Sequence, residues 1–184
     1  MPLDMKKCFF LFLLVCLTVA CTKGNAVRLT YALSPGGAPC SGEITVFGFE
    51  DSRSETALGK KRDGVVITSG SDVADWVGWA LFDELRSAGC DAKYRTSTVA
   101  PGDAPLVTGE VLDVSLNQTG ATTYRGKVTV RIMLQKGGTI IHQEKFTSEV
   151  EDVVLPGYGT ESEIMAEALR GLMGEIVPTV CRKM

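Results

Sequence analysis

The stretch TYRGKVTVRIML, residues 123–134, decides the fold of this chain. Apolar or small residues alternate in it with polar ones: Tyr124, Gly126, Val128, Val130, Ile132 and Leu134 against Thr123, Arg125, Lys127, Thr129 and Arg131. Successive side chains of a strand point to opposite faces of a sheet. The stretch therefore predicts a long strand with one buried face and one wet face.

Further strands lie on both sides of this stretch along the chain. Residues 106–116 lead into it through a hairpin connection, and residues 140–150 follow it after the tight turn Lys136-Gly137-Gly138-Thr139. The apolar phase of residues 106–116 shifts after Val111, which indicates either a bulge there or burial on both faces. Residues 43–50 (EITVFGFE) and 93–98 are predicted to add two shorter strands.

Two amphipathic helices complete the pattern. Apolar side chains recur at helical spacing from Val73 to Leu85, after possible N-caps at Ser69–Asp72 and before Gly89, which suits the end of a helix. A capping box at Thr160–Glu163 starts a second helix, which we expect Pro178 to stop. The order β-α-β-β-β-β-α predicts an α+β two-layer sandwich, a mostly antiparallel sheet with two helices on one face.

The N-terminus has the features of a secretion signal. Lys6 and Lys7 precede an apolar run from Cys8 to Ala20, which is too short to span a bilayer comfortably. We expect three parts: a signal peptide at 1–20, a lipidated tether at 21–42 and one periplasmic domain at 43–184. Translation begins at Met1 or at Met5, since Met5-Lys6-Lys7 is the more typical start of such a segment.

The segment Leu17-Thr18-Val19-Ala20-Cys21 resembles a lipobox, although Thr18 replaces the usual large aliphatic residue. Cys21 is therefore predicted to become the lipid-carrying N-terminus, acylated for example with palmitate. Two or more acyl chains anchor a protein stably. Thr22 stands where an aspartate would signal retention in the inner membrane, so we expect a lipid anchor in the outer membrane with the domain facing the periplasm.

Composition argues against several functions. Removing Asp4, Lys6 and Lys7 with the signal leaves 17 basic and 21 acidic residues, a net charge of −4, which disfavours nucleic acid as a partner. The single histidine, His142, is interpreted as a residue on the surface of a strand, with no nucleophilic side chain expected beside it. Glu50 and Asp51 are read as polar residues at a strand end. No catalytic residue, metal ligand set or cofactor motif is predicted.

Three cysteines follow Cys21 in the mature chain: Cys40, Cys90 and Cys181. The periplasm is oxidising, so one bond among them is possible, and so is none. Cys40 precedes the first strand and Cys90 follows the helix that returns from it, so both should lie at one end of the sandwich. This favours Cys40–Cys90, with Cys90–Cys181 and Cys40–Cys181 left open.

The loop between the first strand and the first helix is the candidate partner-binding site. It carries Asp51, Arg53, Lys60, Lys61, Arg62 and Asp63 where a rigid strand ends, a position that often serves binding. The alternative is a solvated loop. On the wet sheet face, Arg125, Lys127 and Arg131, opposite Lys145, Thr147 and Glu149, could also dock a partner but are interpreted as solvated.

The chain resembles the YajG-like lipoproteins, small envelope proteins of Gram-negative bacteria. The resemblance rests on diffuse marks over roughly residues 28–178: Asp51 and Arg53, Gly59, the Ser-Asp helix start, Thr108-Gly109-Glu110 and Gly126-Lys127-Val128. It implies an outer-membrane lipoprotein without enzymatic activity and supplies no ligand.

Together these features predict a non-enzymatic accessory or adaptor lipoprotein that binds another envelope component. The alternative is a lipid- or glycan-binding auxiliary component of an envelope transport system. A carrier should have an apolar cavity between helices and sheet. An adaptor should have a filled core and an exposed patch.

Overall fold

The computed structural model describes residues 25–34, 39–97 and 103–184. The predicted signal peptide and the lipidation site Cys21 lie outside the described residues. Within the described ranges, no helix is long and apolar enough to cross a membrane.

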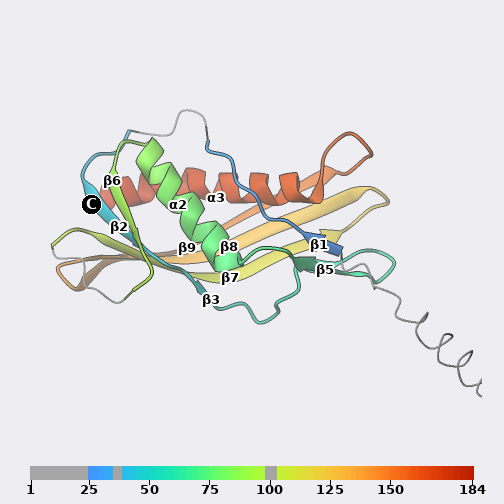
Figure 1. Ribbon diagram of the computed structural model, residues 1–184, viewed down its shortest axis with the longest axis horizontal. Coiled ribbons are helices and arrows are strands. Elements are labelled where there is room, and N and C mark those ends of the chain that lie inside the picture. The colour runs from blue at the N-terminus through green and yellow to red at the C-terminus, as the bar shows by residue number, and fades with distance from the viewer. Residues whose placement is uncertain (1–24, 35–38, 98–102) are drawn as a thin grey trace, which may run out of the picture.

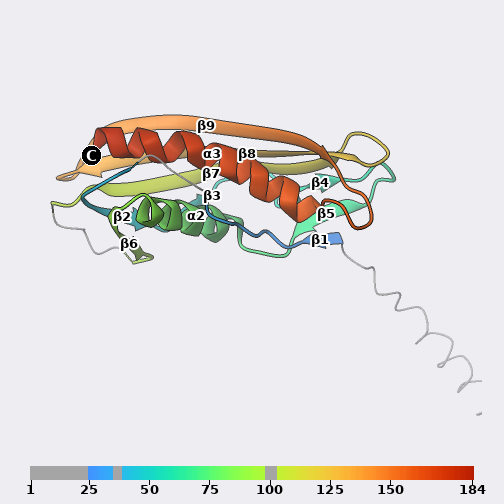
Figure 2. The same cartoon turned by 90° about the horizontal axis from the view of Figure 1, so that it is seen from above.

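The main sheet has the strand order β6-β2-β7-β8-β9, and two helices cover one of its faces (Figures 1 and 2). The antiparallel part consists of β7 (Leu106–Gln118), β8 (Thr123–Lys136) and β9 (Thr139–Val153). Strand β2 (Glu43–Phe47) runs parallel to both β6 (Asp91–Arg95) and β7, and the short β3 (Glu50–Asp51) extends the pairing with β7. The helices are α2 (Val73–Ser87) and α3 (Glu161–Lys183). This arrangement confirms the α+β class with two helices on one face.

Strand β8 has the alternation that its sequence predicts. Tyr124, Gly126, Val128, Val130, Ile132 and Leu134 are all buried. A Cβ added to Gly126 would lie 2.8 Å from Cγ2 of Ile164, so α3 approaches the backbone of β8 closely at this point. The opposite face carries Arg125, Lys127 and Arg131, which pair in register with Glu151, Glu149 and Lys145 of β9. Lys145 and Glu149 are thus confirmed as cross-strand neighbours of these cations, whereas Thr147 pairs with Thr129 and the neighbour of Arg125 is Glu151.

The bulge predicted near Val111 is present in β7. The register with β8 shifts between Val111 and Asp113, which leaves Leu112 as the extra residue. Val107 and Val111 before the bulge, and Val114 and Leu116 after it, are all buried. The extra residue therefore returns the apolar side chains to the buried face.

Both helix starts are capped as predicted. The Asp72 side chain accepts a hydrogen bond from the backbone of Asp75 at the start of α2, and Thr160 does the same for Glu163 at the start of α3. Gly89, with φ of +106°, follows the end of α2.

The expectation that Pro178 stops the second helix is wrong, because α3 continues to Lys183. Proline removes one backbone N–H donor, but Val177, Thr179 and Val180 on both sides of it are buried. Burial of this last apolar turn offsets the lost hydrogen bond and carries the helix to the far end of the sandwich.

A second, smaller sheet with the order β1-β5-β4 joins the N-terminal segment to the domain. Strand β1 (Asn25–Val27) pairs in parallel with β5 (Val66–Ser69), which pairs antiparallel with β4 (Gly59–Lys60). Residues 28–34, here named the strap, then run along the helical face (Figure 1). The sequence assigned residues 25–34 to a tether, but Val27 and Leu29 are buried in the core, so these residues are part of the domain.

Gly59→Ala should destabilise the domain. An added Cβ would lie 2.2 Å from the backbone oxygen of Leu116, which cannot move without disturbing β7. We expect a loss of about 1–3 kcal/mol in the free energy of unfolding, measured by urea denaturation. Gly174→Ala is the matched control, because nothing lies within 4 Å of its added Cβ in α3, and it should stabilise by about 0.5–1 kcal/mol. Equal stability of Gly59→Ala and the unsubstituted chain would contradict the close approach.

Candidate functional site: a groove beside helix α2

A surface groove of about 400 Å³ lies between the strap and α2. We name it the α2 groove. The strap contributes Leu29, Tyr31 and Leu33, and the helix side is formed by Ser71, Asp72, Asp75, Trp76, Trp79, Ala80 and Asp83. Positions 72, 75, 79 and 83, and likewise 72, 76, 80 and 83, are spaced three or four residues apart, so one side of α2 faces the groove.

A buried carboxylate holds the strap against α2. Glu84 is 5% exposed and accepts hydrogen bonds from the Tyr31 hydroxyl and, at 2.7 Å, from the backbone N–H of Ser34. The pKa of Tyr31 lies well above its ordinary value. Burial is the larger cause and the hydrogen bond to Glu84 the second, so this hydroxyl stays protonated and donates. One wall of the groove is therefore fixed to the helix by a charge-assisted hydrogen bond.

Two further hydrogen bonds attach the strap to the helices. The indole N–H of Trp76 donates to the backbone oxygen of Thr30 at 2.9 Å. The Ser162 hydroxyl at the start of α3 donates to the backbone oxygen of Arg28 at 2.7 Å. These contacts extend the strap over α2 and α3, as the blue segment in Figure 1 shows.

An aromatic cluster borders the groove. The ring of Trp79 stacks on Tyr94 of β6 at 4.2 Å between centroids, and Phe82 meets both rings edge to face. Trp79 is 47% exposed, which is high for a tryptophan in a helix that packs on a sheet. The stack holds this exposed ring in a defined position, with Arg86 lying over the neighbouring Phe82.

The rim of the groove is acidic. Asp72, Asp75 and Asp83 are exposed, and none forms an ion pair within the described part of the chain. Burial raises the pKa of Tyr94, and the nearby charges of Asp75 and Asp72 add to the effect. The groove thus combines apolar surface with unpaired negative charge.

The charged loop predicted as a binding site is partly neutralised by its own contacts. Arg53 forms a bidentate ion pair with Asp51, and this hydrogen bonding lowers the pKa of the Asp51 carboxyl. Lys61 pairs with Glu161 at 3.1 Å. Asp63 accepts the backbone N–H of Val65.

The side chains of Lys60 and Arg62 have no ion-pair partner among the described residues and are exposed. They extend from the β4–β5 hairpin, whereas Asp51 lies in β3 beside β7. The six residues chosen from the sequence thus belong to separate short elements. Whether this loop binds a partner stays a prediction.

The wet sheet face is internally paired. Arg131 bonds Glu110 at 2.7 Å, Lys127 lies 3.2 Å from Asp113, and Arg125 contacts both Glu149 and Glu151. Each of these three cations of β8 therefore has an acidic partner on β7 or β9, whereas the exposed Lys145 of β9, opposite Arg131, forms no ion pair among the described residues. Because exposed pairs of this kind satisfy one another, the face offers little uncompensated charge to a partner.

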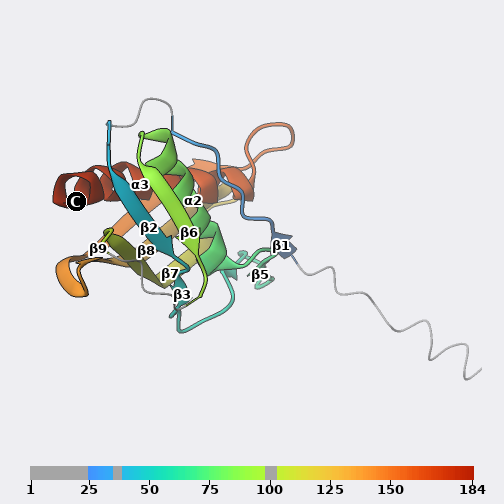
Figure 3. The same cartoon turned by 60° about the vertical axis from the view of Figure 1, so that its left-hand side comes forward.

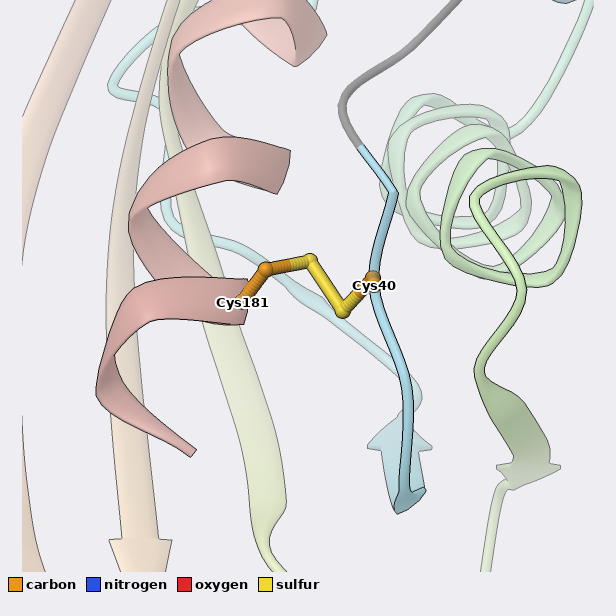
Figure 4. The surroundings of a disulfide bond; sticks show 2 residues. All are labelled: Cys40 and Cys181. Carbon is orange, nitrogen blue, oxygen red and sulfur yellow. A yellow bond between two sulfur atoms is a disulfide. The ribbon is translucent and has the colours of Figure 1, made fainter.

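The three cysteines meet at the end of the sandwich where α3 finishes, with all three sulfurs within 4.8 Å of one another. The bond joins Cys40 to Cys181, at 5.5 Å between Cα atoms (Figure 4), while Cys90 is a buried free thiol. The expectation that Cys40 and Cys90 share one end is confirmed by a hydrogen bond from the backbone N–H of Cys40 to Ala88. The favoured Cys40–Cys90 pairing is wrong, because α3 passes Pro178 and brings Cys181 to the same place.

Burial raises the pKa of the Cys90 thiol, which keeps it protonated and a weak nucleophile at neutral pH. Two of the three sulfurs are bonded to each other, so they offer no thiolate to a metal ion. His142 lies on β9, where its ring nitrogen contacts Glu144 at 3.0 Å.

Sequence reasoning missed the α2 groove for a simple reason. Tyr31 and Ser34 fell in a stretch interpreted as a linker, and Glu84 looked like a surface residue of a helix. The one sequence feature that could have indicated the groove was Trp79, which falls outside the apolar stripe of its helix. A large aromatic residue on a polar helix face is a candidate for binding.

Comparisons with known proteins support the fold. No protein-family model matches the chain, and no curated protein matches it either, so the YajG-like resemblance stays a prediction. Among solved structures, protein XCC0632 of Xanthomonas campestris, assigned to the family DUF330, is similar with a TM-score of 0.64 and 11% identity over 86% of this chain and 95% of that one.

Two further solved structures are similar over much of their length. The hypothetical protein CT253 of Chlamydia trachomatis has a TM-score of 0.50 with 13% identity, over 77% of this chain and 97% of that one. Lipoprotein GNA1162 of Neisseria meningitidis has a TM-score of 0.39 with 14% identity, over 78% and 96%. At these identities the first two likenesses establish the fold alone, and the third carries no argument.

Removing the hydroxyl of Tyr31 should loosen the strap. Tyr31→Phe leaves the buried Glu84 carboxylate with one donor fewer, and we expect a loss of about 1.5–3 kcal/mol in unfolding free energy, measured in urea. Limited proteolysis should also cut the strap faster. Tyr158→Phe is the control, since Tyr158 is exposed and its hydroxyl has no partner among the described residues. Equal behaviour of the two variants would show that the contact adds nothing.

Cys181→Ser should redirect the disulfide. The sulfurs of Cys40 and Cys90 already lie within 4.8 Å of each other, so non-reducing peptide mapping should recover a Cys40–Cys90 peptide. Cys90→Ser is the matched control and should retain the Cys40–Cys181 bond. If mapping of Cys181→Ser finds the thiols of both Cys40 and Cys90 free, Cys90 is not positioned to form a disulfide with Cys40.

Proposed function

We propose that this protein is a non-enzymatic outer-membrane lipoprotein, anchored through Cys21, that binds another envelope protein in the α2 groove. The observation that carries the proposal is the groove itself, in which a fixed and half-exposed Trp79 lies beside the unpaired carboxylates Asp75 and Asp83. Exposed aromatic residues in defined positions are typical centres of protein interfaces.

The chemistry of the groove indicates the kind of partner. Apolar side chains of the strap and Trp79 favour an apolar segment, and the acidic rim favours lysine or arginine on it. A cation above the Trp79 ring would gain both from the aromatic face and from the carboxylates. The expected ligand is therefore a basic, partly apolar segment of another envelope protein.

The core supports an adaptor over a lipid carrier. The space between helices and sheet is occupied by fully buried side chains, among them Leu81, Leu85, Leu169, Leu172 and Met173. The α2 groove lies outside this core, at the edge of α2. A filled core with an exposed patch is the arrangement expected of a binding module.

The surroundings of the single histidine also fit a non-enzymatic role. His142 contacts Glu144 on the exposed strand β9, and its hydrogen bonds within the described residues involve no serine or cysteine. Nucleophilic catalysis would need such a residue in reach of the ring.

Substitutions in the groove should abolish capture of the partner. After crosslinking in intact envelopes, Trp79→Ala should reduce recovery of the crosslinked partner at least tenfold, with some loss of stability from the broken aromatic stack. The pair Asp75→Asn and Asp83→Asn should reduce recovery several-fold with unchanged melting, because neither carboxylate forms an ion pair within the described residues. Lys60→Gln with Arg62→Gln is the matched control, since it changes two exposed charges of the predicted loop. Loss of the same partner in the loop variant, with the groove variants unaffected, would assign binding to the loop.

Lipidation has a separate test. Cys21→Ser, or inhibition of lipoprotein signal peptidase with globomycin, should leave the precursor unprocessed or release the protein from membranes. Normal processing with membrane retention in Cys21→Ser would contradict the anchor. Density-gradient separation of inner and outer membranes tests the predicted outer-membrane location.

A further inference from the structure

Four chain segments meet at one end of the sandwich, which we name the anchor end. They are the start of β1, the β4–β5 turn, the β7–β8 turn and the β9–α3 loop, all at the right of Figures 1 and 2. Lys61 of the β4–β5 turn pairs with Glu161, and Arg62 donates its backbone N–H to Gln118. The backbone N–H of Val154 donates to the backbone oxygen of Thr122, which joins the β9–α3 loop to the β7–β8 turn, and β1 is joined to β5 by strand pairing.

The tips of two of these segments are apolar and exposed. Val65 and Val66 at the β4–β5 turn are 43% and 42% exposed, and Leu155 and Tyr158 in the β9–α3 loop are 43% and 66% exposed. Half of the exposed large apolar side chains of the described residues thus gather at the anchor end. Apolar tips with an exposed tyrosine are typical of contact with the interface of a bilayer.

The chain length to the lipid anchor points to the same end. Three residues, 22–24, separate Cys21 from Asn25, where β1 begins. An extended chain spans at most about 3.6 Å per residue, so the start of β1 lies within about 15 Å of the acylated cysteine. Helix α3 has 23 residues and is about 35 Å long at 1.5 Å per residue, and it ends at the disulfide on the far side. The cysteine end therefore lies beyond the reach of this linker.

We infer that the anchor end docks on the surface of a phospholipid bilayer, with Val65, Val66, Leu155 and Tyr158 entering the headgroup region. The inference rests on the lipidation of Cys21 that the proposed function includes. Docking in this way directs the cysteine end away from the membrane. Helix α2, which forms one wall of the α2 groove, runs along the side of the sandwich (Figure 3). Docking at the anchor end would therefore leave the groove open to a partner in the periplasm.

Apolar contact, more than charge, holds the anchor end to the bilayer. The exposed cations Lys60 and Arg62 share this end with Asp63, Asp152 and Glu163, and Lys61 is paired with Glu161, so cations do not outnumber carboxylates among these residues. Attraction to anionic lipid would weaken as salt rises, whereas insertion of apolar side chains is insensitive to it. We therefore expect bilayer contact that persists at high ionic strength.

Fluorescence quenching tests the contact. The lipidated full-length mature protein is reconstituted in vesicles of phosphatidylethanolamine and phosphatidylglycerol that contain a lipid with a doxyl group near the headgroup. Tyr158→Trp should lose at least a third more of its emission than the unsubstituted protein, whose Trp76 and Trp79 give the background. Ile141→Trp is the matched control, an exposed apolar position in β9 near the opposite end, and should show no added quenching.

The outcomes separate this inference from the proposed function. Flotation of the vesicles first measures anchoring, and failure to float would contradict lipidation at Cys21 and with it the docking. Floating protein in which Tyr158→Trp and Ile141→Trp are quenched equally, or not at all, would overturn the docking while leaving the anchor and the α2 groove intact. Quenching of Tyr158→Trp that disappears in half-molar salt would overturn the apolar contact.

Discussion

Burial of one face of β8 is the constraint on which the rest of the structure depends. Its apolar side chains alternate with charged ones, so both helices must cover the same face of the sheet. Gly126 lets α3 approach the strand closely, and α2 fills the neighbouring space above β2 and β7. With both helices on one side, the outer side of α2 is left exposed, and this is where Trp79 lies beside the strap.

The strap packs on the hydrophobic core and also lines the α2 groove. Val27 at the end of β1 and Leu29 in the strap are buried and tie this segment to the domain, and Glu84 fixes the far part of the strap by accepting hydrogen bonds from Tyr31 and Ser34. The strap therefore forms a wall of the α2 groove, and together with β1 it leaves only residues 22–24 between the described domain and the predicted lipidation site Cys21. A buried carboxylate is costly to desolvate unless hydrogen-bonded, which explains why it has two donors.

Charge is distributed unevenly over the surface. On the wet sheet face each cation of β8 has an acidic neighbour, and in the charged loop Arg53 and Lys61 have partners as well. Along α2, the carboxylates Asp75 and Asp83 form no ion pair with any described residue. Negative charge left unpaired beside a fixed aromatic ring is the feature that distinguishes this side of the molecule.

The sequence by itself determined the strand alternation, both helix caps and the α+β class, because each depends on residues close together in the chain. It offered a bulge near Val111 as one of two explanations for the shift in apolar phase, and the register of β7 against β8 decided for the bulge. The tertiary structure alone decided the partner of Cys40, since three cysteines far apart in sequence reach one place only when α3 continues past Pro178. It also decided the role of the strap, because Tyr31 and Glu84 are 53 residues apart and their hydrogen bond leaves no local pattern. The α2 groove follows from that long-range contact, so no reading of either segment by itself could have predicted it.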